Sequence, residues 1–247
     1  MSGHSAWKNI KHKKAAADAK RGKAWSKCAR AIIVAAHSGG DPDANLALRY
    51  AIDEARSVNM PRDTIEKAIK KGTGELGAEH YESTVYEGYG PGGVALMLEI
   101  LTDNKNRTPP EIRAIFDKHG ARLGTSGCVA YLFQPRGQIY VAKAGTEEEK
   151  IMTAALDAGA LDVSEEGDNW RIITEHAGLM GVRKALESAG FKIESAELTR
   201  IPTTTVAVAG DEARRVLALV EALEDHDDVQ KVHANFEVPD EVLAALK

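Results

Sequence analysis

Residues 8–30 concentrate positive charge, because they contain nine lysine and arginine residues and a single acid, Asp18. Cations at this density recognise phosphate, since they replace the counterions that a polyanion otherwise condenses. The run therefore predicts a nucleic-acid-binding segment. An anionic membrane surface and an acidic protein partner are the alternatives. The membrane is disfavoured because Trp25, Ile32 and Ile33 are expected to pack within the helical unit and so are not available for insertion. The cations are Lys8, Lys11, Lys13, Lys14, Lys20, Arg21, Lys23, Lys27 and Arg30.

The compact polar loop TDNKNRT, residues 102–108, is a second candidate for phosphate binding, through Lys105 and Arg107. An equally good interpretation is a loop that enters a capped helix, with Thr108 as the cap and Glu111 reaching back in a capping box. A hydrolase centred on this loop is a third hypothesis, which the lack of clustered metal ligands in the sequence disfavours.

Other motifs give little support to catalysis or cofactor binding. GYGPGG, residues 88–93, has the glycine spacing of a dinucleotide site, but a strand-like run follows it and Pro91 removes an amide donor. A turn between two strands is favoured instead. The eight histidines are dispersed without metal-site spacing, and neither Ser126 nor Cys128 has a recognisable base. We expect no enzymatic activity, no catalytic residue, no metal and no cofactor.

Charge is segregated along the chain, whose net charge is −5. Residues 1–76 carry 15 basic and 8 acidic side chains, whereas residues 77–247 carry 17 and 29, so a basic module precedes an acidic body. Cys28 and Cys128 have apolar sequence neighbours and form no CxxC pair, which is typical of reduced thiols. Because no apolar run can span a bilayer and the N-terminus lacks an apolar signal core, we expect a cytoplasmic protein.

The first helix of the basic module is predicted over residues 15–36. Its periodicity places Lys20, Lys23, Lys27 and Arg30 on one face and the apolar residues on the other. We therefore expect these four cations to point away from the core.

Two shorter helices follow in the same module. The second begins after the GGDP break, with Asp41 as its N-cap and Pro42 at its first position. Pro61 begins the third, which ends at Gly72. The three helices predict a basic three-helix domain over residues 1–78.

After the third helix the periodicity becomes extended, and strands and helices alternate. Residues 135–202 have the strand–helix–strand–strand–helix–strand order of a ferredoxin-like fold. The flanking segments, 79–134 and 203–247, form one discontinuous α+β domain around it. CVAYLF, residues 128–133, and TTTVAVA, residues 203–209, are expected to be strands of that outer domain. The predicted class is α+β, with a helical N-terminal domain followed by two ferredoxin-like domains, one inserted into the other.

Four stretches together resemble the YebC/PmpR family of probable transcriptional regulators: GHSAWKNIKHKKAAADAKRGKAW, NMPRDTIEKAIKKGTGE, YEGYGPGGVA and LTDNKNRT. The mitochondrial translational activator of cytochrome oxidase subunit I is a relative in that family. The resemblance extends over the whole chain. It implies a cytoplasmic three-domain protein that acts in gene expression without catalysis.

The resemblance also transfers nucleic-acid-binding roles to matching positions. Ala6 stands where the family usually has lysine, Trp25 where it has phenylalanine, and Ala121 where it has glycine. The matching positions are Lys8, Lys11, His12, Lys13, Lys14, Lys20, Arg21, Lys23 and Lys27 in the basic motif, and Lys70 and Lys71 in the third helix.

The expected function is a non-enzymatic, nucleic-acid-binding regulator of gene expression, in the first place a DNA-binding transcriptional regulator. The resemblance leaves one alternative open, a ribosome-associated translation factor that contacts ribosomal and transfer RNA and assists elongation. Lysine binds the phosphates of DNA and RNA alike, so the residue types favour neither. The expected partner is nucleic acid or the ribosome, without a membrane, and the sequence predicts no oligomeric state.

Overall fold

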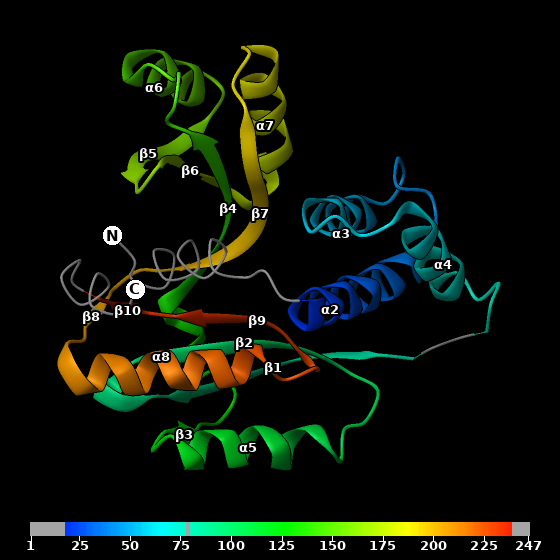
Figure 1. Cartoon of the computed structure of the whole chain (residues 1–247), viewed down its shortest axis with the longest axis vertical. Coiled ribbons are helices and arrows are strands. Elements are labelled where there is room, and N and C mark those ends of the chain that lie inside the picture. Colours follow the sequence, from blue (N-terminus) through cyan, green and yellow to red (C-terminus); the bar gives the residue numbers. More distant parts are fainter. Residues whose placement is uncertain (1–17, 78–79, 239–247) are drawn as a thin grey trace. The chain divides into compact units, whose positions relative to one another are not determined.

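The computed structural model describes residues 18–77 and 80–238, and its class is α+β, as the sequence predicts. Helices make up its N-terminal part, and strands and helices alternate afterwards (Figure 1). Contacts divide the chain into two compact units: residues 133–203 form one, and the described residues before and after them form the other. A separate three-helix domain ending at residue 78 stays a prediction.

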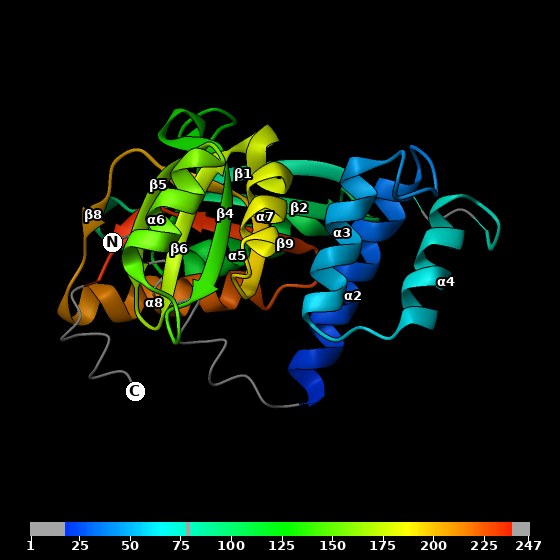
Figure 2. The same ribbon diagram turned by 90° about the horizontal axis from the view of Figure 1, so that it is seen from above.

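The N-terminal helices are α2 (Asp18–Ala36), α3 (Leu46–Ser57) and α4 (Arg62–Gly72). Both α3 and α4 pack against α2 (Figure 2). Their apolar faces share one core, in which Ile32 and Leu48 have no exposed surface. The helical periodicity produces this core because residues three and four apart lie on the same face.

The start of α3 differs from the prediction. Asp41 and Pro42 lie in a turn before the helix, and Asn45 is the N-cap. Asn45 Oδ1 accepts a hydrogen bond from Leu48 N at 3.1 Å, and Asn45 Nδ2 donates to the carbonyl oxygen of Ala35 at 2.7 Å. An aspartate carboxylate could accept the first of these bonds but could not donate the second. Asparagine can do both, and it thereby ties the end of α2 to the start of α3.

The discontinuous part after the helices, residues 80–132 and 204–238, is called the α+β body below. Its main sheet is antiparallel with the strand order β3-β1-β2-β9, and it shares a core with two helices. Leu96 of the central strand and Phe116 of the first helix are fully buried there. The elements are β1 (Glu82–Tyr89), β2 (Ala95–Thr102), α5 (Thr108–Lys118), β3 (Arg122–Leu123), α8 (Gly210–Glu224) and β9 (Val229–Ala234).

GYGPGG ends β1 with its first two residues and forms the turn to β2 with the others, as the sequence analysis favours. The turn contains a short 3-10 helix, η1 (Pro91–Gly93). Gly92 and Gly93 have φ angles of 70° and 75°, a backbone region that glycine enters without steric cost. The glycine spacing that resembles a dinucleotide site is therefore explained by the conformation of this turn.

The expected strand over residues 128–133 is wrong. Most of it is loop and a 3-10 helix, η2 (Ala130–Leu132), and the short β3 pairs with β1 in its place. The cause is Glu87, a buried carboxylate on β1 that accepts backbone hydrogen bonds from Gly127, Val129 and Ala130 at 2.7–2.8 Å. Amides that bind a carboxylate are not available for a strand ladder.

The expected strand over residues 203–209 is also shorter than predicted. Only β8 (Val206–Ala207) forms, and it pairs in parallel with β10 (Phe236–Glu237). The strand that joins the main sheet from the C-terminal part is β9, beside β2.

The unit of residues 133–203 has an antiparallel sheet with the order β5-β6-β4-β7 and two helices, which is the ferredoxin-like arrangement. Ile139, Ile151, Ile172 and Leu186 are fully buried in it. Its elements are β4 (Phe133–Ala142), α6 (Glu148–Asp157), β5 (Ala160–Glu166), β6 (Asn169–Glu175), η3 (His176–Gly178), α7 (Leu179–Ser188) and β7 (Ile193–Pro202).

Candidate nucleic-acid interface

The basic run lies only partly within the described residues. Lys20 and Arg21 belong to the first turn of α2, and of Lys20 the backbone alone is described. Arg21 is exposed. The candidates that fall outside the described residues are Lys8, Lys11, His12, Lys13 and Lys14.

Two lysines of α2 contact the C-terminal end of α8. Lys23 Nζ donates to the carbonyl oxygen of Asp225 at 2.8 Å, and Lys27 Nζ donates to that of Glu224 at 2.5 Å. The last carbonyls of a helix lack intrahelical donors and carry its partial negative charge, so they favour cations. Both ammonium groups thus lie outside the apolar core, as expected, but they bind carbonyl oxygens of the α+β body.

Asp228, just before β9, is a carboxylate with only 1% of its surface exposed, and it accepts from several elements. Arg30 Nη1 of α2 lies 3.2 Å from its Oδ1 and also donates to the carbonyl oxygen of Asp227. Arg107 Nη2 donates to its Oδ2 at 3.0 Å, and Thr108 Oγ1 does so at 2.7 Å. The carboxylate thus joins α2 to the start of α5.

These hydrogen bonds control the pKa of Asp228. Burial alone would raise the pKa of the carboxyl, but the donors from Thr108, Arg107 and Thr102 and the charge of Arg107 outweigh burial and hold the pKa below 3.8. Thr102 Oγ1 lies 3.2 Å from Oδ2. Asp228 is therefore ionised at neutral pH, and its bonds to Arg30 and Arg107 are charge-assisted.

Both cations of the TDNKNRT loop are engaged in ion pairs. Lys105 Nζ lies 2.5 Å from Glu82 Oε2, and Arg107 Nη2 lies 2.7 Å from Asp103 Oδ1. Asn104 Oδ1 accepts from the backbone N–H of Arg107 at 3.1 Å and thereby shapes the turn into α5. These contacts favour a loop that enters a helix.

The capping box expected at that helix does not form. Thr108 is the first residue of α5, and its hydroxyl donates to Asp228. Glu111 Oε2 lies 3.0 Å from His226 Nε2 and makes no described contact with the cap backbone. Long-range partners replace the box: the Thr108 hydroxyl donates to a carboxylate, and the Glu111 carboxylate lies within hydrogen-bond distance of an imidazole nitrogen.

Lys70 and Lys71 lie in the last turn of α4, where positive charge complements the helix dipole. Lys70 is exposed and has no ion-pair partner among the described residues, and Lys71 is half-buried. Lys70 is therefore available to an external anion.

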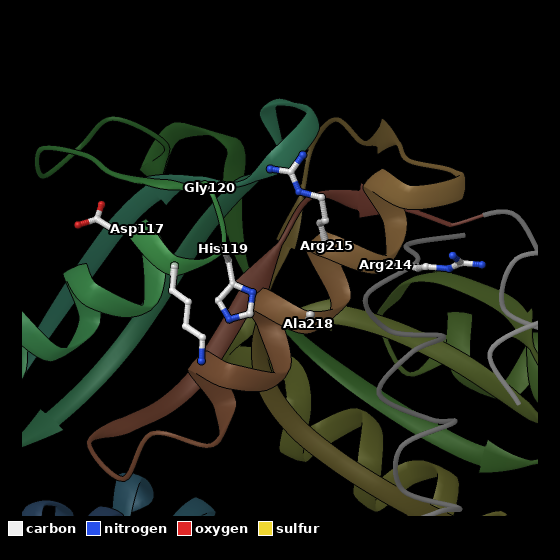
Figure 3. Close-up of a pocket in the computed structure, with 7 residues that line it drawn as sticks. Asp117, His119, Gly120, Arg214, Arg215 and Ala218 are labelled. Carbon is white, nitrogen blue, oxygen red and sulfur yellow. The ribbon is translucent and has the colours of Figure 1, made fainter.

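An open hollow on the α+β body brings together cations that sequence reasoning missed. It lies between the C-terminal end of α5, which carries His119, and α8, which carries Arg214 and Arg215 (Figure 3). Periodicity could not reveal it, because the two segments are far apart in a stretch that is acidic overall. The adjacent arginines near the start of α8 were the only clue. The lining residues are Asp117, Lys118, His119, Gly120, Arg214, Arg215 and Ala218.

Two negative findings apply to residues 18–77 and 80–238. No group of three or more histidine, cysteine, aspartate or glutamate side chains there could hold a metal ion. No helix there combines the length and apolar character that crossing a membrane requires.

Comparisons with known proteins agree with the fold and the motifs. The family model described as "TACO1/YebC protein N-terminal domain" matches residues 5–75, and "TACO1/YebC second and third domain" matches residues 81–236. A "probable transcriptional regulatory protein" of Dictyoglomus thermophilum is 53% identical over 100% of both chains. One of Pelotomaculum thermopropionicum is 54% identical over 97% of this chain and 100% of its own.

A solved structure shows the same fold. The crystal structure of a conserved hypothetical protein from Aquifex aeolicus superposes with a TM-score of 0.83 and 48% sequence identity, covering 92% of this chain and 94% of its own. Together, the two family models span most of the sequence, and relatives that are about half identical cover its whole length. This chain therefore belongs to the TACO1/YebC family.

Proposed function

We propose that the protein is a non-enzymatic regulator of gene expression that acts in the cytoplasm and binds DNA through its basic N-terminal segment. The observation that carries the proposal is the run of nine cations against one acid in residues 8–30. A run of one sign in a chain whose net charge is −5 indicates an anionic partner, and phosphate is the anion that lysine and arginine bind in nucleic acids. The name "probable transcriptional regulatory protein" of the relatives supports a regulatory role.

The contacts of α2 refine which cations we assign to the phosphates. Lys23, Lys27 and Arg30 hold the segment that ends α8, so in the proposal they position α2 and contribute less to direct binding. Lys105 and Arg107 are assigned a lesser role for the same reason, since each is in an ion pair. For the other predicted positions we keep the assignment made from the sequence: Lys8, Lys11, His12, Lys13, Lys14, Lys20, Arg21, Lys70 and Lys71.

The salt dependence of duplex binding tests the proposal. With about six phosphate contacts, the logarithm of the affinity for a 20-base-pair duplex should fall with the logarithm of salt concentration with a slope of about −5. A Lys11→Ala, Lys13→Ala, Lys14→Ala triple variant should weaken this slope by about 3 units. Fluorescence anisotropy at several salt concentrations measures both.

A matched control removes three lysines from the other unit. The variant Lys150→Ala, Lys184→Ala, Lys192→Ala loses the same charge, and two of these lysines form only exposed ion pairs. It should leave the slope nearly unchanged. A slope near zero for the unaltered protein, or equal losses in the two triple variants, would contradict the proposal. Co-sedimentation with ribosomes, without enrichment on chromosomal DNA, would replace DNA by RNA as the target.

A further inference from the structure

The hollow between α5 and α8 holds cations that the fold itself does not use. Lys118, Arg214 and Arg215 have neither an ion pair nor a side-chain hydrogen bond to any residue in the described part of the chain. Arg107 of the same body differs, because it forms ion pairs with Asp103, Glu111 and Asp228. Of the two arginines, Arg215 points toward the turn at Gly120 and Arg214 extends away from it (Figure 3), so the unpaired Arg215 guanidinium is the one that the hollow offers to an external anion.

Helix stability does not account for the two arginines. Both lie beyond the first turn of α8 and far from its last turn, so neither end of the helix dipole favours positive charge there. Glu212, an acid one turn before Arg215, is directed elsewhere, because a Cβ added at Gly92 would lie 2.7 Å from its Cδ atom. The Glu212 carboxylate therefore lies against the η1 turn. Neither the helix dipole nor an ion pair within the described residues therefore accounts for Arg214 and Arg215.

The turn after α5 is shaped around one of these guanidinium groups. Gly120 has a φ of +66°, and a Cβ at this position would lie 2.6 Å from Arg215 Nη2. Glycine thus permits both the backbone turn and the close approach of Arg215. Figure 3 shows Arg215 beside this turn and His119 on the adjoining end of α5.

Burial and a neighbouring cation both act on His119. Burial lowers the pKa of its imidazole, and the charge of Lys118 lowers it further. Asp117 is the only acid among the lining residues, against three permanent cations. The hollow therefore has a positive potential on a body whose residues are acidic overall.

We propose that this hollow binds a backbone phosphate of the nucleic acid and forms a second contact apart from the basic N-terminal segment. The proposal rests on the proposed function and deepens it. An open surface whose only apolar side chain is that of Ala218 offers no enclosure for a base or a small-molecule cofactor. Arginine presents paired donors that match phosphate oxygens, and this suits a phosphodiester at the surface.

A double variant tests the site. Lys118→Ala, Arg215→Ala should weaken the salt slope for the 20-base-pair duplex by about 2 units, because two phosphate contacts are lost. The control Lys150→Ala, Lys184→Ala removes the same charge from the other unit and should change it little. With Arg215→Lys in place of Arg215→Ala in the double variant, part of the lost slope should return, because lysine supplies the charge without the paired donors. Thermal unfolding of every variant checks that the fold persists.

His119 supplies a second readout. Its imidazole resonance, assigned by its loss in His119→Asn, should titrate at higher pH in the presence of saturating duplex, because a bound phosphate opposes the positive charge of Lys118. An unchanged His119 titration, or a double variant that behaves like its control, would overturn this proposal. The proposed function would survive that result if the Lys11→Ala, Lys13→Ala, Lys14→Ala variant still showed a weaker salt dependence of duplex binding than the unaltered protein.

Inorganic pyrophosphate serves as the probe for a free anion. If the duplex does not bind at all, the proposed function fails, and so does the backbone contact at the hollow. If the pKa of the His119 imidazole rose with pyrophosphate but not with duplex, the hollow would not bind a nucleic-acid backbone phosphate. It would then be assigned to a free phosphate compound.

Discussion

At the scale of single residues, Asp228 has the widest role among the described contacts. Its carboxylate accepts from α2 through Arg30, from the start of α5 through Arg107 and Thr108, and from the end of β2 through Thr102. A buried carboxylate is tolerated only when donors satisfy it, and here four side chains do. The residue thereby joins the helical part to the α+β body.

Replacing this carboxylate should lower stability. Asp228→Asn keeps the shape but weakens the charge-assisted bonds, so the free energy of unfolding at pH 7 should fall by about 2–3 kcal/mol. The adjacent variant Asp227→Asn is the control, because Arg30 contacts Asp227 only through its backbone carbonyl. Urea denaturation measures the difference, and equal effects of the two variants would contradict the role of Asp228.

The lowered pKa of Asp228 adds a pH dependence with a definite sign. The folded state holds the pKa below 3.8, so the stabilisation is complete above the pKa of an unfolded aspartate, about 3.9, and is lost as pH falls through the folded pKa. The difference in unfolding free energy between the natural chain and Asp228→Asn should therefore shrink in acid. A difference that stays constant from pH 7 to pH 2 would exclude this linkage.

At the scale of elements, the contact between α2 and α4 depends on a missing side chain. A Cβ at Gly72 would lie 2.4 Å from the carbonyl oxygen of Ile33 and 2.6 Å from Ala36 Cβ. The glycine at the end of α4 thus lets the two helices approach closely, in addition to its expected role in ending the helix.

Two glycine substitutions should have opposite effects. Gly72→Ala forces α4 away from α2 and should destabilise the protein by about 1–3 kcal/mol. Gly22→Ala, in the exposed first half of α2 with no atom within 4 Å of an added Cβ, should stabilise it by about 0.5–1 kcal/mol through helix propensity. Denaturation curves of both variants check the signs, and a stabilising Gly72→Ala would refute the packing argument.

The elements differ in how well local patterns predict them. Helix periodicity predicts the apolar faces of α2, α3 and α4 correctly, since one apolar face suffices to position a helix on a core, but the predicted cap of α3 is wrong. The strand expected over residues 128–133 is wrong because Glu87, about 40 residues earlier, binds its amides. A local β propensity cannot anticipate such a competitor.

At the scale of the whole molecule, the two charge regions contact each other. Lys23, Lys27 and Arg30 of the basic part meet the carbonyl and carboxylate oxygens of residues 224–228 in the acidic part. Part of the positive run therefore has internal partners, so not all of its charge is available to the proposed nucleic acid.

Reversing two of these charges should loosen α2 from the α+β body. Lys27→Glu, Arg30→Glu replaces attraction by repulsion and should lower stability by about 2 kcal/mol or more. Amide exchange should become faster in α2 and in residues 224–228. The control Lys184→Glu, Lys192→Glu reverses equal charge in the other unit and should not alter exchange in those segments. Unchanged exchange in both variants would contradict the internal contact.

The sequence by itself determined the basic run, the three N-terminal helices, the α+β class and the resemblance to a family, because each is written in local composition, periodicity or motif. Only the tertiary structure decided which cations meet oxygens about 200 residues away, how Asp228 gathers its donors, and how α5 and α8 form a cationic hollow. These features depend on contacts between distant segments, and a side chain's neighbours across such distances follow from packing and leave no periodic trace.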